Sequence, residues 1–178
     1  MTRRLLFLVL LTHAAAVLAF ADEDRDWGLS ATRDIRQAPY SAPTPLEVPG
    51  ARTASTEALK EMLAATSSAL LVDVAAGEGH LSLKGAVWLP NAGRGVHYVD
   101  PVQADTADRL SALTGRDKAR PLVFFCVNAQ CWLSYNASLR AVALGYSRVY
   151  WYRGGIAAWR EAGLPLERLG ESAAPAAR

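Results

Sequence analysis

The chain has few of the residues that build metal centres and disulfide scaffolds: its 178 residues include two cysteines, three histidines and two methionines. Two cysteines cannot form the several bridges of a small secreted scaffold, so the fold must rest on a hydrophobic core. The 17 acidic and 19 basic residues nearly balance, and no basic stripe is visible. Nucleic acid is therefore not an expected partner. No internal repeat is present either, and the length fits one domain of ordinary size.

The N-terminal segment, residues 1–21, has the pattern of a secretory signal peptide. Arg3 and Arg4 form a positive n-region, an apolar run follows, and the segment ends in a small-x-small cleavage site. The apolar run is short for a membrane span. We therefore expect cleavage before Asp22 and no stable membrane span afterwards, with retention as an N-terminal anchor as the alternative. Export predicts a periplasmic protein whose cysteines lie in an oxidising compartment.

Three segments follow the predicted signal. Residues 22–54 are rich in Pro, Ala, Thr and charge, which predicts an extended N-terminal arm that Trp27, Tyr40 and Leu46 fix to the domain surface. A floppy linker is the alternative interpretation. Residues 55–169 alternate between strand-like and helix-like patterns, which predicts an α/β domain with a central, mostly parallel sheet flanked by helices. The Ala- and Pro-rich residues 170–178 are expected to form a flexible tail.

Short continuous apolar runs predict the strands of this domain. Runs without alternation suit strands that are buried on both faces of a parallel sheet. Apolar residues at helical spacing predict the helices between them, and Gly145 closes the third. The expected strands are 69–74, 86–90, 120–125 and 148–152, and the expected helices are 57–65, 106–114, 133–144 and 156–162.

Both cysteines lie between an expected strand and the next expected helix. Parallel α/β sheets bind ligands at the carboxyl ends of their strands, where Cys126 is expected. A helix N-terminus offers free N–H groups and a positive dipole end, which lower a thiol pKa. Cys126 is therefore the candidate catalytic nucleophile, and a buried cysteine that acts as a small apolar residue is the alternative. The candidate site comprises Cys126 and Cys131 as catalytic residues and Val127, Asn128, Ala129, Gln130 and Trp132 as the substrate-binding loop.

The spacing of the two cysteines permits them to act together. A curled loop brings its ends close, so a Cys126–Cys131 disulfide forms if the Cα atoms lie within about 7 Å. Cys131 would then be a resolving thiol that attacks a Cys126 persulfide, releases reduced sulfur and leaves a disulfide. The alternative is a static staple of the loop in an oxidising compartment.

Metal, haem and other cofactors have little support in the sequence. Covalent haem attachment requires Cys-x-x-Cys-His, which the chain lacks. His80 or His97 with the two cysteines would make only a weak zinc or copper site. We therefore expect no metal and no cofactor. Trp132, directly after the second cysteine, either shields the thiols or fills volume in the core.

Four short segments carry a characteristic order of motifs. They are an Asp-Val strand end at 71–74, a Gly-Ala-x-x-x-Pro segment at 85–90, an apolar strand that ends in cysteine at 123–126, and a strand segment at 144–150 followed by Gly-Gly-x-x-x-Trp at 154–159. In this order and spacing they resemble the rhodanese family over residues 55–166. The resemblance implies a rhodanese-like α/β fold and sulfur transfer through a persulfide on the cysteine that ends the third strand.

Two features depart from the usual rhodanese pattern. Ala75 stands where the family carries Arg after its Asp-Val, and the loop 126–131 lacks the cations of the usual Cys-Arg-x-Gly-x-Arg. A thiosulfate anion would meet backbone N–H groups but no arginine. The loss of one such charge-assisted bond costs about 1.5–3 kcal/mol. We therefore expect inefficient thiosulfate:cyanide transfer and favour paired-cysteine chemistry, either sulfur transfer or dithiol–disulfide exchange.

A narrower resemblance concerns residues 131–137 and the proline-rich residues 40–51 of the arm. They are similar to exported rhodanese-like proteins of the PQQ-dependent catabolism-associated CXXCW motif family. This implies a link to quinoprotein alcohol oxidation in the periplasm, and it does not imply that the chain binds the quinone. The expected partners are a small sulfur donor or acceptor, a periplasmic redox protein, or a quinoprotein dehydrogenase system. The alternative is a non-catalytic accessory module with a structural Cys126–Cys131 disulfide.

Overall fold

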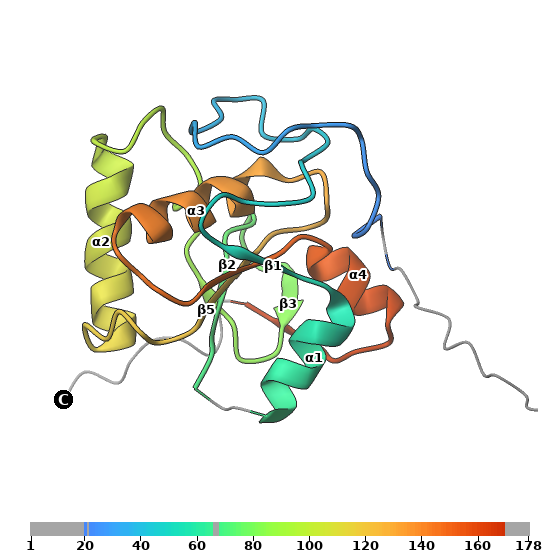
Figure 1. Ribbon diagram of the computed structural model, residues 1–178. Helices are drawn as coiled ribbons and strands as arrows, with labels where there is room; N and C mark the ends of the chain where they lie inside the picture. The colour runs from blue at the N-terminus through green and yellow to red at the C-terminus, as the bar shows by residue number, and fades with distance from the viewer. Residues whose placement is uncertain (1–19, 21, 66–67, 170–178) are drawn as a thin grey trace, which may run out of the picture.

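A central sheet of parallel strands organises the protein (Figure 1). The structure is a computed structural model that describes residues 20, 22–65 and 68–169, so the predicted signal peptide (apart from Phe20) and the predicted tail lie outside the described residues. The strand order is β1-β6-β5-β2-β4, and each neighbouring pair is parallel. The strands are β1 (Arg52–Ala54), β2 (Leu70–Asp73), β4 (Val87–Trp88), β5 (Leu122–Phe125) and β6 (Val149–Tyr152).

Helices cover both faces of this sheet, which confirms the predicted fold class. In Figure 1, α2 and α3 lie on one side of the sheet and α1 and α4 on the other. No helix in the described part of the chain is both long and apolar enough to cross a membrane. The helices are α1 (Thr56–Ala65), α2 (Pro101–Thr114), α3 (Trp132–Ala143) and α4 (Gly155–Glu161), and a small antiparallel pair joins β3 (Leu81–Leu83) to β7 (Leu166–Arg168).

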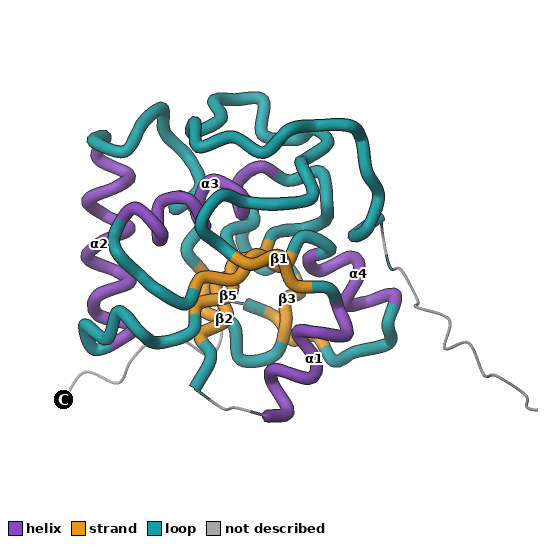
Figure 2. Tube along the Cα trace, in the orientation of Figure 1, coloured by secondary structure: helices purple, strands orange, loops and turns teal. Residues whose placement is uncertain are grey.

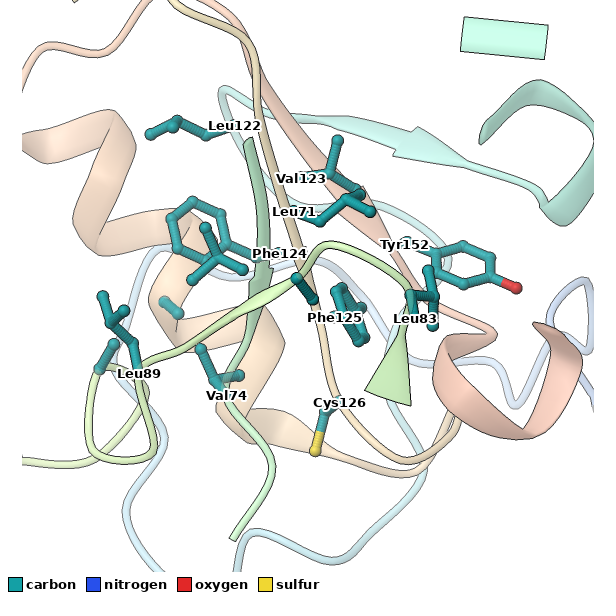
Figure 3. Packing of buried hydrophobic residues seen from close by; sticks show 14 of the residues in the cluster. Leu71, Val74, Leu83, Leu89, Leu122, Val123, Phe124, Phe125, Cys126 and Tyr152 are labelled. Carbon is teal, nitrogen blue, oxygen red and sulfur yellow. The ribbon is translucent and has the colours of Figure 1, made fainter. Parts of the chain in front are cut away.

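The two central strands form the middle of the core. Every residue of β2 and β5 is buried, and Leu71 pairs with Val123 in parallel register. Their apolar runs are continuous because side chains on both faces meet helices. Figure 3 shows Leu71, Val123 and Phe125 packed together in this cluster. Since the strands run parallel, the carboxyl ends of β2, β5 and β6 meet at one edge, which therefore carries Cys126.

Some elements differ from the sequence prediction. Strand β1 lies inside the predicted arm, and β3 and β7 were not predicted, because each has three residues and no continuous apolar run. Helix α2 begins at Pro101 rather than at residue 106. Asp100 is its N-cap and accepts the N–H of Gln103, and proline suits the first helical position since its missing N–H has no helical partner there.

The arm packs against the domain through an arginine that follows β6. The buried Arg153 donates hydrogen bonds to the carbonyl oxygens of Asp22, Glu23, Arg25 and Thr44, and to the Thr44 hydroxyl. All three guanidinium nitrogens are therefore engaged with the arm. In Figures 1 and 2 the arm, blue to cyan in Figure 1, runs as a loop across α3.

Polar side chains of α3 hold the middle of the arm. The Tyr135 hydroxyl donates to the carbonyl of Thr32 and accepts its N–H, and the Asn136 amide exchanges two hydrogen bonds with the backbone of Arg36. Near its start, the buried Glu23 accepts the backbone N–H and hydroxyl of Thr56 at the N-terminus of α1. Burial raises the pKa of Glu23 above its usual value. The arm is thus tied to α1, to α3 and to the arginine that follows β6.

Candidate active site

The candidate nucleophile lies at the carboxyl edge of the sheet. Cys126 follows β5 directly and is 2% exposed. Figure 3 shows it at the margin of the core cluster, beyond Phe125 and Val74. The Val74 N–H donates to the Phe125 carbonyl, which holds the end of β5 beside the chain that leaves β2. The strand ends therefore fix the position of Cys126.

The two cysteines are joined in a disulfide, as the spacing allowed. The sulfur atoms of Cys126 and Cys131 are 1.98 Å apart, and the Cα atoms are 6.1 Å apart. Cys131 is the N-cap residue of α3 and is 7% exposed. Because α3 has 12 residues, its N-terminus places a positive dipole end beside this sulfur. A thiolate formed there on reduction is stabilised by that field.

The N-terminus of α4 holds one side of the loop. The N–H groups of Ile156 and Ala157 donate to the carbonyls of Cys126 and Val127. Gly155 makes this contact possible, because it has a φ of 61° and a Cβ added there would lie 2.2 Å from the Cys126 oxygen. The Gly-Gly motif therefore allows the N-terminus of α4 to pack directly against the cysteine loop.

The arm holds the other side of the loop. Residues 40–42 run antiparallel to residues 130–132: the Ala42 N–H donates to the Gln130 carbonyl, and the Trp132 N–H donates to the Tyr40 carbonyl. The Asn128 side chain accepts the Gln130 N–H. Two N–H groups of the loop are thus already engaged, which leaves fewer of them to stabilise a negatively charged persulfide.

A cavity of about 290 Å³ opens onto the disulfide. Both sulfur-bearing residues line it, together with Tyr40, Arg94 and Asn128. Of the other predicted loop residues, Val127 and Gln130 also line this cavity, whereas Ala129 and Trp132 do not. Ala129 is buried and its carbonyl accepts the Thr44 hydroxyl; Trp132 packs against Tyr135 and Trp151 in a second core cluster, its indole N–H bound to the Pro43 carbonyl.

The position of Arg94 differs from the expectation that the site contains no arginine. The motif comparison predicted that an anion in this site would meet no arginine, because the loop 126–131 has none. The structure brings a guanidinium from the turn after β4 to the same cavity. No local pattern around residue 94 could have revealed this, since the placement depends on long-range contacts with α3.

The histidines considered as metal ligands lie outside this cavity. His80 contacts the buried carboxylate of Asp73 at 2.9 Å, and the Ser82 hydroxyl and the Ala75 N–H donate to the same carboxylate. The His97 ring accepts the N–H of Val99. Within residues 20, 22–65 and 68–169, no group of three or more His, Cys, Asp or Glu residues is arranged to hold a metal.

Comparison with known proteins establishes the family. Residues 55–162 match the Rhodanese-like domain, so this chain belongs to the rhodanese-like family. No curated protein gave a significant match.

Solved structures agree with the fold. A full-length protein from Lactobacillus plantarum is 22% identical, with a TM-score of 0.51, and the match covers 66% of this chain and 88% of that one. The Alr3790 protein from Anabaena sp. is 21% identical with a TM-score of 0.50, over 64% of this chain and 90% of that one. A thiosulfate sulfurtransferase from Pseudomonas aeruginosa is 20% identical with a TM-score of 0.50, over 66% of this chain and 20% of that one.

Proposed function

We propose that this protein carries out dithiol–disulfide exchange through Cys126 and Cys131, and that Cys126 also carries sulfur as a persulfide. The observation that supports this most strongly is that both partners of the disulfide line one cavity at the carboxyl edge of the sheet. An exchangeable disulfide needs a sulfur that an attacking thiolate can reach. The cavity volume of about 290 Å³ suits a small thiol or a single inserted side chain.

The exchange reaction needs only the protein disulfide and two substrate thiols to balance its atoms and electrons. A substrate thiolate attacks Sγ of Cys126, the Cys126–Cys131 bond breaks, and Sγ of Cys131 leaves as a thiolate at the N-terminus of α3. A second substrate thiolate attacks the substrate sulfur of the mixed disulfide, which releases substrate disulfide and the Cys126 thiolate. Two substrate thiols are oxidised, the protein disulfide gains two electrons, and the two thiol protons pass to the cysteines.

The sulfur-transfer reaction begins from the reduced pair. The Cys126 thiolate attacks the sulfane sulfur of a donor, whose sulfur–sulfur bond breaks, and the rest of the donor leaves with the electron pair. The Cys131 thiolate then attacks Sγ of the Cys126 persulfide and expels hydrosulfide, which restores the disulfide. Since Gln130 and Trp132 already use their N–H groups, the persulfide is a transient species in this proposal.

The proposed setting is the periplasm, in association with PQQ-dependent alcohol oxidation. The signal-like pattern of residues 1–21 supports export, and a cysteine pair that cycles through a disulfide suits an oxidising compartment. The similarity of residues 131–137 and of the proline-rich residues 40–51 to the CXXCW motif family supports the link to quinoprotein oxidation. A periplasmic redox protein or a quinoprotein dehydrogenase system would then supply or receive the electrons.

Serine variants of the two cysteines test this function. Cys131→Ser should trap Cys126 as an adduct, because no second thiol remains to resolve it. After incubation of the reduced protein with a small disulfide or a sulfane-sulfur donor, intact mass should show one added thiol or one added sulfur that reductant removes. The matched variant Cys126→Ser should gain far less. Equal labelling of both variants, or labelling of neither, would contradict the assigned roles.

A structural staple is the second candidate function. Both cysteines are nearly buried, and Cys131 takes part in the antiparallel contact with Ser41 of the arm. A staple would serve a non-catalytic accessory module. In that case the two serine variants should lose similar amounts of stability and form no adduct, and the native disulfide should persist in reductant until the protein unfolds.

A further inference from the structure

We propose that Arg94 makes this site selective for small thiols that carry a carboxylate or sulfonate near the sulfur. The inference rests on the proposed thiol–disulfide function and adds the substrate class. It assigns a direct substrate contact to a residue that lies outside the cysteine loop and outside the motifs of the family resemblance.

Charge at the cavity supports this assignment. Among the described residues that line it, Arg94 is the only one with a charged side chain; the polar neighbours are Tyr40, Ser41, Asn128 and Gln130. A guanidinium binds a carboxylate or sulfonate through two parallel N–H donors, which also fixes the orientation of the ligand. A substrate held in this way presents its thiolate toward the disulfide that lines the same cavity.

The backbone at Arg94 is held firmly by α3. The carbonyl of Gly93 accepts the Asn136 side-chain N–H, and the carbonyl of Arg94 accepts the Arg140 guanidinium, both donors being fully buried. Gly93 permits the close approach, since a Cβ there would lie 2.0 Å from the Leu133 oxygen. The turn is therefore fixed against the same helix that carries Cys131 at its N-terminus.

The side chain of Arg94 remains available to a ligand. Its guanidinium lies 5.8 Å from the ring centroid of Tyr40, a cation–π contact that keeps it beside the cavity. Arg94 is exposed, and no carboxylate in the described part of the chain forms an ion pair with it. Arg94 therefore has a fixed backbone and a guanidinium that forms no ion pair with the described carboxylates. Such a side chain is suited to bind the anionic group of a ligand.

The test compares reduction of the disulfide by three probe thiols that differ in charge: 3-mercaptopropionate, 2-mercaptoethanol and cysteamine. Rates are measured on the oxidised full chain by alkylation and intact mass. The readout is the ratio of the 3-mercaptopropionate rate to the cysteamine rate. Comparing this ratio between variants removes the intrinsic reactivity of each thiol. The variants are Arg94→Gln, Arg94→Lys and, as a matched control, Arg148→Gln, which removes an exposed arginine at the opposite edge of the sheet.

Arg94→Gln should lower this ratio about three- to tenfold, the effect of one exposed charge a few ångströms from the ligand. Arg94→Lys should keep only part of the preference, because an ammonium retains the charge but lacks the two parallel donors, and Arg148→Gln should match the native chain. Added salt should lower the native ratio toward that of Arg94→Gln, because it screens the attraction.

Two distinct failures can be told apart. If all three thiols reduce the disulfide but Arg94→Gln leaves the ratio unchanged, the role of Arg94 is overturned and the proposed function stands. If none of the thiols reduces the native disulfide, the proposed exchange function itself fails.

Discussion

At the scale of single residues, the site depends on buried polar side chains whose hydrogen bonds hold the backbone of the segments around the cavity. Arg140 is fully buried in α3 and donates to the carbonyls of Arg94 and His97, to the side chain of Gln103 and to the carboxylate of Asp100. This single side chain therefore fixes the segment that carries the cavity's cation. Its charge is compensated by Asp100 at 2.9 Å.

The Asp100–Arg140 pair predicts how the stability of the fold depends on pH. Burial alone would raise the pKa of Asp100, but hydrogen bonds from Arg140 and from the N–H groups of Val96, Gln103 and His97 outweigh it and hold the pKa well below its usual value. Because the folded-state pKa is the lower one, this stabilisation is complete above the unfolded-state pKa of about 3.9 and is lost as the pH falls toward the folded value.

Asp100→Asn should therefore destabilise the protein by about 3 kcal/mol at pH 7, the usual cost of breaking a buried ion pair. The difference from the native chain should shrink below about pH 4, where the unfolded chain takes up the proton. Urea unfolding at pH 7 and pH 3 measures both values. Asp105→Asn is the control: its exposed pair with Arg109 should be worth less than about 1 kcal/mol. An Asp100→Asn deficit that does not change with pH would contradict the account.

At the scale of elements, the arm behaves as a structural part of the domain. It supplies a carboxylate at the N-terminus of α1, lies across α3 and pairs with the cysteine loop. Arg153 connects its beginning to its later part, because Asp22, Glu23, Arg25 and Thr44 bind the same guanidinium.

Arg153→Lys should loosen the arm. Lysine has three rotatable donors and cannot reproduce the planar set of five hydrogen bonds, so carbonyls of the arm would be left buried without partners. We expect a loss of about 2–4 kcal/mol in the free energy of unfolding and faster proteolysis within residues 22–51. Arg25→Lys, in an exposed pair with Asp22, is the matched control and should change stability little. Equal effects of the two variants would refute the role assigned to Arg153.

The elements also show what sequence could and could not predict. Strands β2, β5 and β6 were located to within two residues, because burial on both faces requires a continuous apolar run. Strand β1 has only Ala54 buried, and so gave no such signal. The cysteine loop could be predicted as a candidate site because it lies between a strand and a helix. The position of Arg94 beside that loop could not be predicted, since it depends on Asn136 and Arg140, which lie more than 40 positions away along the chain.

At the scale of the whole molecule, both cysteines belong to the main buried cluster, but the disulfide between them is only a small part of what holds the fold. Two buried clusters, on the sheet and along α3, hold the fold, and the disulfide within the first of them closes a loop between residues only five positions apart. A loop this short constrains the unfolded chain little, and its closure contributes about 2 kcal/mol in the chain-entropy description. We therefore expect the Cys126–Cys131 bond to open and re-form while the domain stays folded.

The most direct test of this account is native-state reduction of the disulfide. The oxidised protein is equilibrated in buffers of increasing dithiothreitol, alkylated and analysed by intact mass, while circular dichroism follows the fold. The account predicts that both cysteines become alkylated over a reversible two-electron transition with the circular dichroism unchanged, and that removal of reductant restores the disulfide. A disulfide that is alkylated only when the circular dichroism signal is lost would contradict the exchange function and identify the bond as a staple.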